Sequence, residues 1–322
     1  MRVITAAEIE EALHWPDLVE ALREAFRGGI ATPPRHHHTI ERPGGADATL
    51  LLMPAWSDFM AQGHADTGFV GVKVVSVFPD NAALARPTVA GVYLLLSGRS
   101  GEPVAAIDGR MLTLWRTAAA SALAARYLAR EDASRLLVVG AGALAPYLAE
   151  AHASVRPIRE ILVWNRTAER ARWLARSLHA RAGGAYTVGA TEDLEAAVRG
   201  AHVVSCATLS AEPLVRGAWL SPGTHVDLVG AFTPRMREAD DEAMRRARLF
   251  VDTRAGALAE AGDVVQALAS GAIAQGDIAA DLFELTAGSR AGRRFYDQIT
   301  LFKSVGASLE DLAAAQLVLR RV

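Results

Sequence analysis

Short apolar runs alternate with segments of helical spacing through the second half of the chain. Strands are therefore expected to alternate with helices. The expected strands begin at Arg135 and at Ile161 and continue at 201–207, 224–229 and 249–252. This alternation is typical of a doubly wound parallel sheet, for which about six strands are expected.

The N-terminal part of the chain has a different pattern. Residues 5–30 predict two short helices, and residues 32–54 predict an extended, loop-like segment. Three strands are expected at 68–78, 88–97 and 103–108. The last two are joined by Ser-Gly-Arg-Ser-Gly, a good hairpin loop, so a small and largely antiparallel sheet is predicted here.

Two long helices connect these parts. An Ala-rich helix at 111–129 leads into the second part, and a final helix at 306–320 is expected to pack back on the first. The predicted fold class is α/β, with a Rossmann-type doubly wound parallel sheet and a smaller, discontinuous α+β domain. The domain boundaries are expected at 1–115 with 300–322, and at 116–299.

Composition excludes several classes of protein. The chain has 322 residues, a formal charge of −2 and 51% hydrophobic residues, which suits packed helices over a parallel sheet. The chain has no Lys/Arg block with interleaved aromatic residues, so nucleic acid is not an expected partner. The longest uncharged run, 136–149, is too short to span a membrane. We expect no apolar export segment at the N-terminus. With one cysteine, Cys206, no intrachain disulfide can form. We expect a cytoplasmic protein.

The strand from Arg135 runs into glycines and then into a helix. Gly140 permits a tight turn, Gly142 lets phosphates approach, and Ala145 allows close packing of helix on strand. Such a turn presents backbone amides to a pyrophosphate, so it predicts a dinucleotide site. A structural strand–helix turn is the alternative.

The next strand ends at the position where an acid would normally hold the adenosine ribose. Asn165, Arg166 and Thr167 stand there instead. No carboxylate repels a 2′-phosphate, and a guanidinium can pair with one. We therefore expect NADP(H) to be preferred, with NAD(H) possible.

Two cations lie in apolar segments. Lys73 lies in a strand that is apolar on both faces, so it needs an anion or a lowered pKa unless it reaches water at an edge. Arg116 is the only charge between Arg110 and Arg126. Its planar fork suits a carboxylate, and a structural salt bridge to a distant acid is the alternative.

Asp227 lies toward the carboxyl end of an expected parallel strand, the edge at which such sheets bind ligands. Beside a nicotinamide it is a candidate proton carrier; otherwise it caps a loop. The run His36-His37-His38 is not expected to bind a metal, because adjacent strand residues point to opposite faces.

The chain resembles the ornithine cyclodeaminase/mu-crystallin family over nearly its full length. The matching signatures are Pro34-Arg35, Leu52-Met53-Pro54, Gly71-Val-Lys73, Pro87-Thr88, Arg116-Thr-Ala-Ala119, Gly140-Ala-Gly142, Trp164-Asn-Arg166, Asp227-Leu-Val-Gly230 and Phe302-Lys-Ser-Val-Gly306. The resemblance implies a homodimer paired through the N-terminal sheet, with an active site between two domains.

The resemblance also implies roles for single residues. Arg35, Lys73 and Arg116 would grip a substrate carboxylate, with Asp227 and Lys73 as catalytic residues. The expected substrate-binding set is Arg35, Lys73, Thr88, Arg116, Val305 and Gly306. The expected cofactor-binding set is Thr117, Gly140, Gly142, Ala143, Leu144, Asn165, Arg166, Thr167, Ala207, Thr208 and Lys303.

Members of that family share hydride transfer at the α-carbon of an amino or imino acid. This chain has Leu51 where ornithine-type enzymes carry a glutamate, and Lys303 where they favour an aspartate. We therefore expect reduction of a cyclic ketimine such as pyrroline- or piperideine-2-carboxylate. The alternatives are an ornithine cyclodeaminase, an alanine dehydrogenase, a shikimate-dehydrogenase-like enzyme, and a non-catalytic NADP-binding crystallin-like protein.

Overall fold

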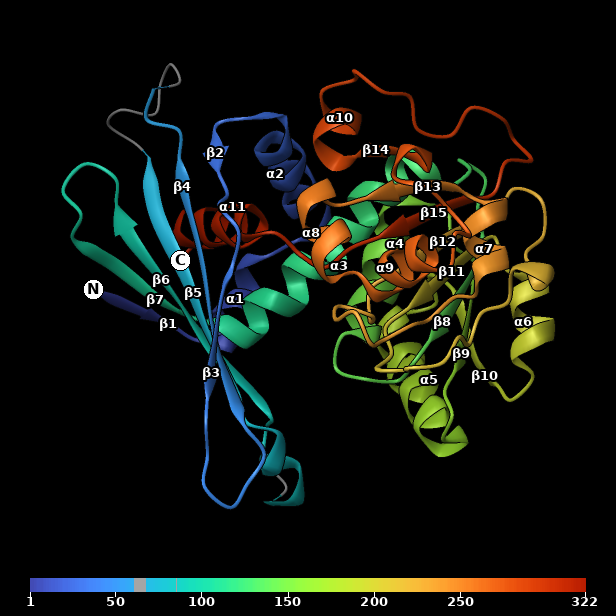
Figure 1. Ribbon diagram of the computed structural model, residues 1–322, viewed down its shortest axis with the longest axis horizontal. Helices are drawn as coiled ribbons and strands as arrows, with labels where there is room; N and C mark the ends of the chain where they lie inside the picture. The colour runs from blue at the N-terminus through green and yellow to red at the C-terminus, as the bar shows by residue number, and fades with distance from the viewer. Residues whose placement is uncertain (61–67, 85) are drawn as a thin grey trace. The chain divides into compact units, whose positions relative to one another are not determined.

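The computed structural model describes residues 1–60, 68–84 and 86–322, and the chain separates into two compact units (Figure 1). The first unit holds residues 1–117 and 307–322, and the second holds 118–306. The chain passes between them within α3 (Gly109–Leu128). Residues 300–306 were expected in the first domain but belong to the second unit, because β15 (Thr300–Lys303) pairs with strands of the second sheet.

The first unit is built on a seven-stranded sheet in the order β1-β7-β6-β5-β4-β2, with β3 also paired to β4. The strands are β1 (Arg2–Ile4), β2 (Ile30–Ala31), β3 (His36–Ile40), β4 (Ala48–Ser57), β5 (Phe69–Val77), β6 (Val89–Ser97) and β7 (Pro103–Asp108). Only β1 pairs in parallel, so the sheet is largely antiparallel, as predicted.

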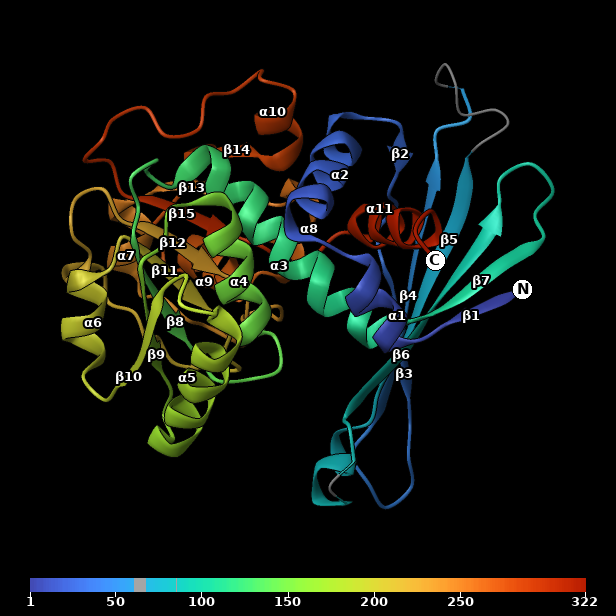
Figure 2. The same cartoon turned by 180° about the vertical axis from the view of Figure 1, so that it is seen from behind.

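Helices of the first unit cover one face of this sheet. They are α1 (Ala6–Ala12), α2 (Trp15–Arg27) and α11 (Ser308–Leu319), whereas the 3-10 turn η1 (Pro79–Leu84) lies between β5 and β6 in the chain. α11 packs on β5, β4 and β6, with α2 against its other side (Figure 2). Alternate residues of the strands are buried beneath α11, as a pleated sheet covered on one face requires.

Two strands lie where a loop was expected. β3 lies within residues 32–54, and β4 begins there and continues to Ser57. The segment lacks clean alternation because Leu50, Leu51, Leu52 and Met53 form a continuous apolar run. The structure shows such a run as a strand whose two faces are both apolar. A continuous run does not distinguish a buried strand from other buried structure, which explains the missed prediction.

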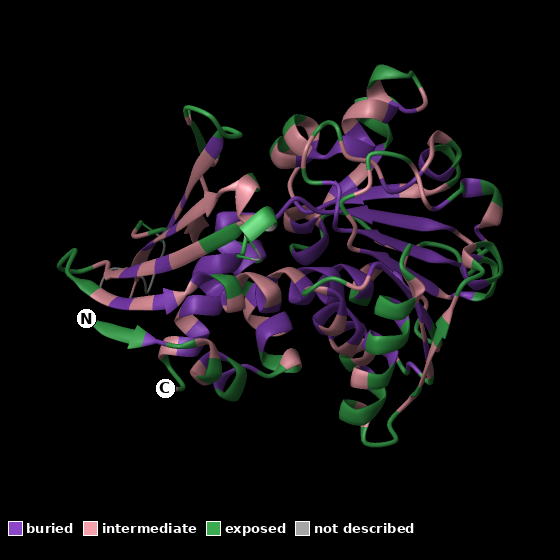
Figure 3. Cartoon of the chain, turned by 90° about the horizontal axis from the view of Figure 1, so that it is seen from below, coloured by how far each residue is buried: buried purple, intermediate pink, exposed green. Residues whose placement is uncertain are grey.

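The second unit holds an eight-stranded parallel sheet in the order β10-β9-β8-β11-β12-β15-β13-β14. Its strands are β8 (Arg135–Val139), β9 (Glu160–Trp164), β10 (Thr187–Thr191), β11 (Val203–Cys206), β12 (His225–Leu228), β13 (Arg248–Val251), β14 (Ile278–Asp281) and β15 (Thr300–Lys303). Figure 3 shows its central strands as buried, in contrast to the mixed burial of the first sheet.

The helices of the second unit follow its strands in sequence. They are α4 (Ala145–Val155), α5 (Ala168–Ala182), α6 (Leu194–Gly200), α7 (Asp241–Arg246), α8 (Arg254–Glu260), α9 (Gly262–Ala269), α10 (Leu282–Thr286) and the 3-10 turns η2 (Gly217–Trp219) and η3 (Gln275–Asp277). The predicted fold class is confirmed, although the sheet has eight strands and not six. Among the described residues, no helix is both long and apolar enough to cross a membrane.

Candidate active site

Strand register in the first unit brings Arg35 and Lys73 into one row. Lys73 of β5 lies opposite Met53 of β4 and Tyr93 of β6. His36 of β3 pairs with Leu52, so Arg35, one residue earlier, lies beside Met53. The positive charge of Arg35 acts on Lys73, which agrees with this placement.

Lys73 is 2% exposed and forms an ion pair with Asp311 of α11. Its Nζ lies 2.7 Å from Oδ2 and 2.9 Å from Oδ1 of that carboxylate. Burial, together with the charges of Arg116 and Arg35, lowers the pKa of Lys73 to about 8 against the opposing effect of Asp311. The ammonium has three donors, and its one hydrogen bond among the described residues goes to Oδ1 of Asp311.

Arg116 is buried on α3 and contacts two acids at the start of α11. Its Nη1 donates to Oε2 of Glu310 at 2.6 Å, and its Nε donates to Oδ1 of Asp311 at 3.1 Å. The other oxygen of Glu310 accepts the backbone N–H of Ala307 at 3.3 Å and so caps the helix. Asp311 therefore joins Lys73 and Arg116 into one ionic cluster.

The prediction that Lys73 and Arg116 need an anion is met within the first unit by Asp311 and Glu310. The alternative interpretation of Arg116, a salt bridge to an acid far away in sequence, is thus also correct. Sequence reasoning missed both acids. The signal was present, because Glu310 and Asp311 are the only charges in an otherwise apolar stretch that begins at Val305.

Thr88 is not brought beside Lys73 by the first unit. It precedes β6 and lies five residues before Tyr93, the residue opposite Lys73. Five residues of extended chain span roughly 16 Å. Its expected role in substrate binding therefore remains a prediction.

The glycine turn of the second unit has the geometry that its sequence predicts. Gly140 has φ +110°, and a Cβ there would lie 2.7 Å from the carbonyl oxygen of Ala207. A Cβ on Gly142 would meet nothing within 4 Å. Gly142 and Ala143 are exposed, and Leu144 precedes the first turn of α4 without a side-chain cap. The open space and the uncapped helix start fit a pyrophosphate.

Asn165 connects this turn to the next helix. Its Oδ1 accepts the N–H of Ala141 at 3.2 Å, and its Nδ2 donates to the carbonyl of Thr167 at 3.0 Å. Arg166 and Thr167 are exposed beside it. Next to them is a cavity of about 350 Å³, lined by Ala141, Glu169, Arg170 and Trp173.

Asp227 is fully buried in β12. One carboxylate oxygen accepts Ser121 Oγ at 3.0 Å, and the other accepts Ser205 Oγ at 2.7 Å and contacts His152 Nε2 at 3.0 Å. These partners lie on α3, β11 and α4, so Asp227 joins two helices to the sheet. Hydrogen bonding and the charge of His152 lower its pKa against the raising effect of burial. Its role as a proton carrier remains a prediction.

Val305 and Gly306 also have internal partners. Their backbone N–H groups donate to Oδ2 of Asp252 at 2.7 and 2.6 Å. Asp252 follows β13 and so fixes the turn after β15, where Gly306 has φ +84°. Lys303, an expected cofactor contact, is fully buried and lies 3.4 Å from Asp263.

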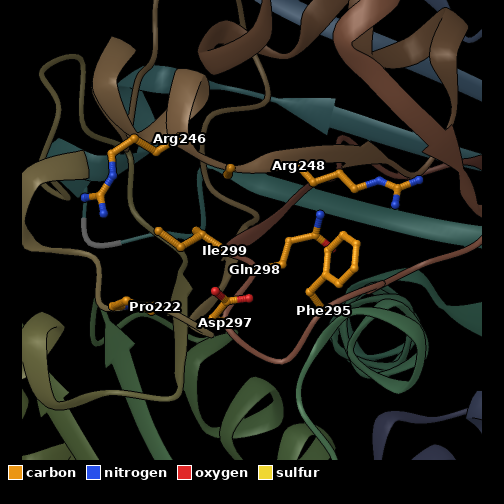
Figure 4. Close-up of a pocket in the computed structure, with 8 residues that line it drawn as sticks. Pro222, Arg246, Arg248, Phe295, Asp297, Gln298 and Ile299 are labelled. Carbon is orange, nitrogen blue, oxygen red and sulfur yellow. The ribbon is translucent and has the colours of Figure 1, made fainter.

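A second cavity, of about 590 Å³, lies at the amino ends of the strands of the second sheet (Figure 4). Arg246 and Arg248 line it, but their guanidinium groups point apart in Figure 4, so they do not form one anion site. No group of three His, Cys, Asp or Glu suited to a metal occurs among the described residues.

A family model described as the ornithine cyclodeaminase/mu-crystallin family matches residues 1–322. The chain belongs to this family. The Δ1-pyrroline-2-carboxylate reductase of Paracoccus denitrificans is 38% identical to this chain over 309 residues, which are 96% of this chain and 93% of that protein. The family predicted from the sequence signatures is thus confirmed.

Two solved structures extend the comparison with this family member. Thermococcus litoralis Δ1-pyrroline-2-carboxylate reductase in complex with NADH and L-proline has a TM-score of 0.91 at 32% identity, covering 100% of this chain and 97% of that chain. An archaeal alanine dehydrogenase dimer with bound NAD has a TM-score of 0.88 at 30% identity, covering 100% of this chain and 95% of that chain.

Proposed function

We propose that the protein is an NADPH-dependent reductase of a cyclic imino acid such as pyrroline- or piperideine-2-carboxylate. The observation that carries this proposal is a group of three cations in the first unit, Arg35, Lys73 and Arg116, which lies beside a row of apolar side chains. On the sheet face that carries Lys73, the next cross-strand pair is Leu51 of β4 with Val75 of β5. Both side chains are half-buried. The carboxylate of a substrate can bind to these cations. A positively charged side chain on the substrate would find no anion at Leu51 or Val75.

The substrate carboxylate is assigned to Arg35, Lys73 and Arg116. Lys73 offers an ammonium already enclosed and held in place by Asp311, and Arg116 offers a guanidinium fixed by two acids. Groups held in this way lose little further freedom when an anion binds. The ligands named for the Thermococcus relative, NADH and L-proline, support the same substrate class.

The nicotinamide cofactor is assigned to the second unit and supplies a hydride when bound. Gly140, Gly142 and Ala143 would hold its pyrophosphate, since the turn is open and the helix start is uncapped. Arg166 and Thr167 would hold the adenosine end. The exposed Arg166 favours NADPH, because an arginine pairs well with a 2′-phosphate.

Arg166→Gln should weaken NADPH binding by about tenfold and leave NADH binding within twofold. The loss corresponds to roughly 1.4 kcal/mol of binding free energy, a modest value because the side chain is exposed and its charge is screened. Titration of both cofactors by fluorescence measures the two dissociation constants. Arg172→Gln, which changes an exposed arginine of α5, the helix that follows Arg166, is the control. Equal losses for both cofactors would contradict the assignment.

The lowered pKa of Lys73 predicts a basic limb in kcat/KM. The carboxylate needs the ammonium form, so kcat/KM should fall about tenfold per unit as the pH rises above about 8. NMR of lysine-labelled protein checks the cause directly, because the chain contains only two lysines. A Lys73 signal that titrates near 10.5 would contradict this prediction.

The reaction itself is tested by consumption of NADPH with pyrroline- and piperideine-2-carboxylate. L-ornithine without added reductant tests the cyclodeaminase alternative, and pyruvate with ammonia tests the alanine dehydrogenase alternative. Turnover of the cyclic imines at least a hundredfold above both is expected. Proline release from ornithine without reductant would overturn the proposal.

We also propose a homodimer formed through the uncovered face of the first sheet. The residues opposite to the α11 face are apolar and half-buried or exposed: Leu52, Pro54, Trp56, Val70, Val72, Val74, Val92, Leu94 and Leu96. Within the described part of the first unit, α11 packs on the other face. A contiguous apolar face of this kind is typical of an interface between subunits. The dimeric state named for the archaeal alanine dehydrogenase supports it.

A further inference from the structure

Three charged side chains form a fully buried cluster in the second unit: Glu238, Asp263 and Lys303. The ammonium of Lys303 lies 3.4 Å from Oδ2 of Asp263, and its charge also acts on Glu238. Neither Lys303 Nζ nor Asp263 Oδ2 has a hydrogen-bond partner among the described residues. Two buried carboxylates require a nearby cation, and Lys303 supplies it.

The choice of lysine at this position is informative. Of the 34 basic residues only Lys73 and Lys303 are lysines, and both are buried. Every other basic residue is an arginine. An ammonium is a compact point charge, whereas a guanidinium is planar and more extended. Each of the two lysines lies beside a buried carboxylate, Lys73 beside Asp311 and Lys303 beside Asp263.

The carboxylate of Glu238 bridges two loops. Its Oε1 accepts the N–H of Thr208 at 2.7 Å and the hydroxyl of the same residue at 2.9 Å. Its Oε2 accepts the N–H of Gly230 at 2.7 Å. Asp263 Oδ1 in turn accepts the N–H groups of Glu238 and Ala239 at 2.8 and 2.9 Å. The cluster thus fixes both the side chain and the backbone of Glu238.

The bridged loops pack directly on each other and on the glycine turn. A Cβ on Gly230 would lie 2.0 Å from the carbonyl oxygen of Thr208. A Cβ on Gly140 would lie 2.7 Å from the carbonyl oxygen of Ala207 and 3.2 Å from Cγ2 of Thr208. A displacement of either loop would therefore be transmitted to its neighbour.

The loops lie at the carboxyl edge of the second sheet, next to the point where the strand order reverses. β8 and β11 are neighbours, with β9 and β10 on one side and β12 on the other. A dinucleotide binds across such a point, one half on each side. Gly140 and Arg166 follow β8 and β9 and so belong to the adenosine half. The loops after β11 and β12 border the nicotinamide half.

We propose that Glu238, held by Asp263 and Lys303, is a positioning residue that fixes the loops after β11 and β12 for the nicotinamide half of the cofactor. The inference rests on the proposed function only for the identity of the cofactor. Glu238 does not touch the reacting atoms. It acts through the backbone amides of Thr208 and Gly230.

The protonation state of Glu238 controls this bridge. Burial raises the pKa of Glu238 to about 7, with Asp263 adding to the rise and Lys303 opposing it. Once protonated, one carboxyl oxygen carries the proton and accepts less well, so one loop loses its acceptor. The nearby Cys206 thiol has its pKa raised by burial and stays neutral. The bridge is therefore complete above pH 7 and weakens as the pH falls.

Hydrogen exchange of the cofactor-free protein tests the bridge without any assay of activity. In the wild type, protection of the Thr208 and Gly230 amides, corrected for intrinsic exchange, should fall about tenfold between pH 8 and pH 6. In Glu238→Gln the amide group offers only one oxygen, so at pH 8 at least one of these amides should exchange about tenfold faster. Glu242→Gln, an exposed acid nearby, is the control. Unchanged exchange at both amides would overturn the proposal.

Binding and turnover test the positioning role. Glu238→Gln should lower kcat at saturating NADPH about tenfold and change the dissociation constant of 2′,5′-ADP less than twofold, because the adenosine half is not bridged. An unchanged kcat per folded enzyme would overturn the role even where exchange is faster. Wild-type protein that reduces no cyclic imine would instead refute the proposed function, and the exchange result would still decide the bridge.

Discussion

Lys73→Met is expected to lower kcat/KM for a cyclic imino acid about a hundredfold, while the dissociation constant of NADPH stays within twofold. Methionine keeps the length of the buried side chain and removes its charge and its donors. The loss corresponds to roughly 3 kcal/mol, the usual range for removing one partner of an enclosed charged interaction. Steady-state kinetics and cofactor titration measure the two quantities separately.

The contrast between substrate and cofactor is what makes this experiment decisive. Lys73 lies in the first unit and the glycine turn lies in the second, so a defect in carboxylate binding should leave cofactor binding intact. Lys73→Arg keeps the positive charge and should retain more activity than methionine at high pH, because arginine stays protonated. If the methionine variant keeps full kcat/KM, the assignment of the substrate carboxylate to this cluster is wrong.

Arg116→Met is expected to destabilise the protein by roughly 3–5 kcal/mol and to abolish measurable turnover. The substitution removes the buried guanidinium that Glu310 and Asp311 share. Removing one partner of a buried ion pair leaves an uncompensated charge, and this accounts for the size of the effect. Urea unfolding at fixed protein concentration measures it.

Two further variants separate this mechanism from simple loss of packing. Arg110→Met removes an exposed arginine of the same helix and should change the free energy of unfolding by less than 0.5 kcal/mol. Adding Glu310→Gln to Arg116→Met removes one of the two buried negative charges that faced the guanidinium and should recover part of the stability. Equal stabilities of the single and double variants would show that charge is not the cause.

The second unit was predictable in outline because its signals are local. The glycine turn, the strand before it and the Asn165-Arg166-Thr167 segment are contiguous in sequence, and each has one clear physical reading. The short strands β10, β14 and β15 were missed. β10 is only partly buried, so its apolar pattern is weak.

The ionic clusters could not be predicted in full because their members are far apart in sequence. The sequence around Lys73 indicated a buried cation, but no nearby residue predicts that its partner is Asp311. Asp227 was noticed as an acid at a sheet edge, and the hydroxyl and imidazole partners that enclose it come from three other elements. Sequence patterns report burial and charge, whereas pairing depends on the tertiary fold.

The distance in sequence between α11 and the sheet that it covers has a consequence for biosynthesis. The first unit combines residues 1–117 with 307–322, so its sheet is translated long before the helix that packs on it. Until residues 307–322 have left the ribosome, Lys73 and Arg116 have neither Asp311 nor Glu310 to neutralise them, and the apolar face of the sheet is not covered by α11. The nascent chain is therefore most prone to aggregation during that interval.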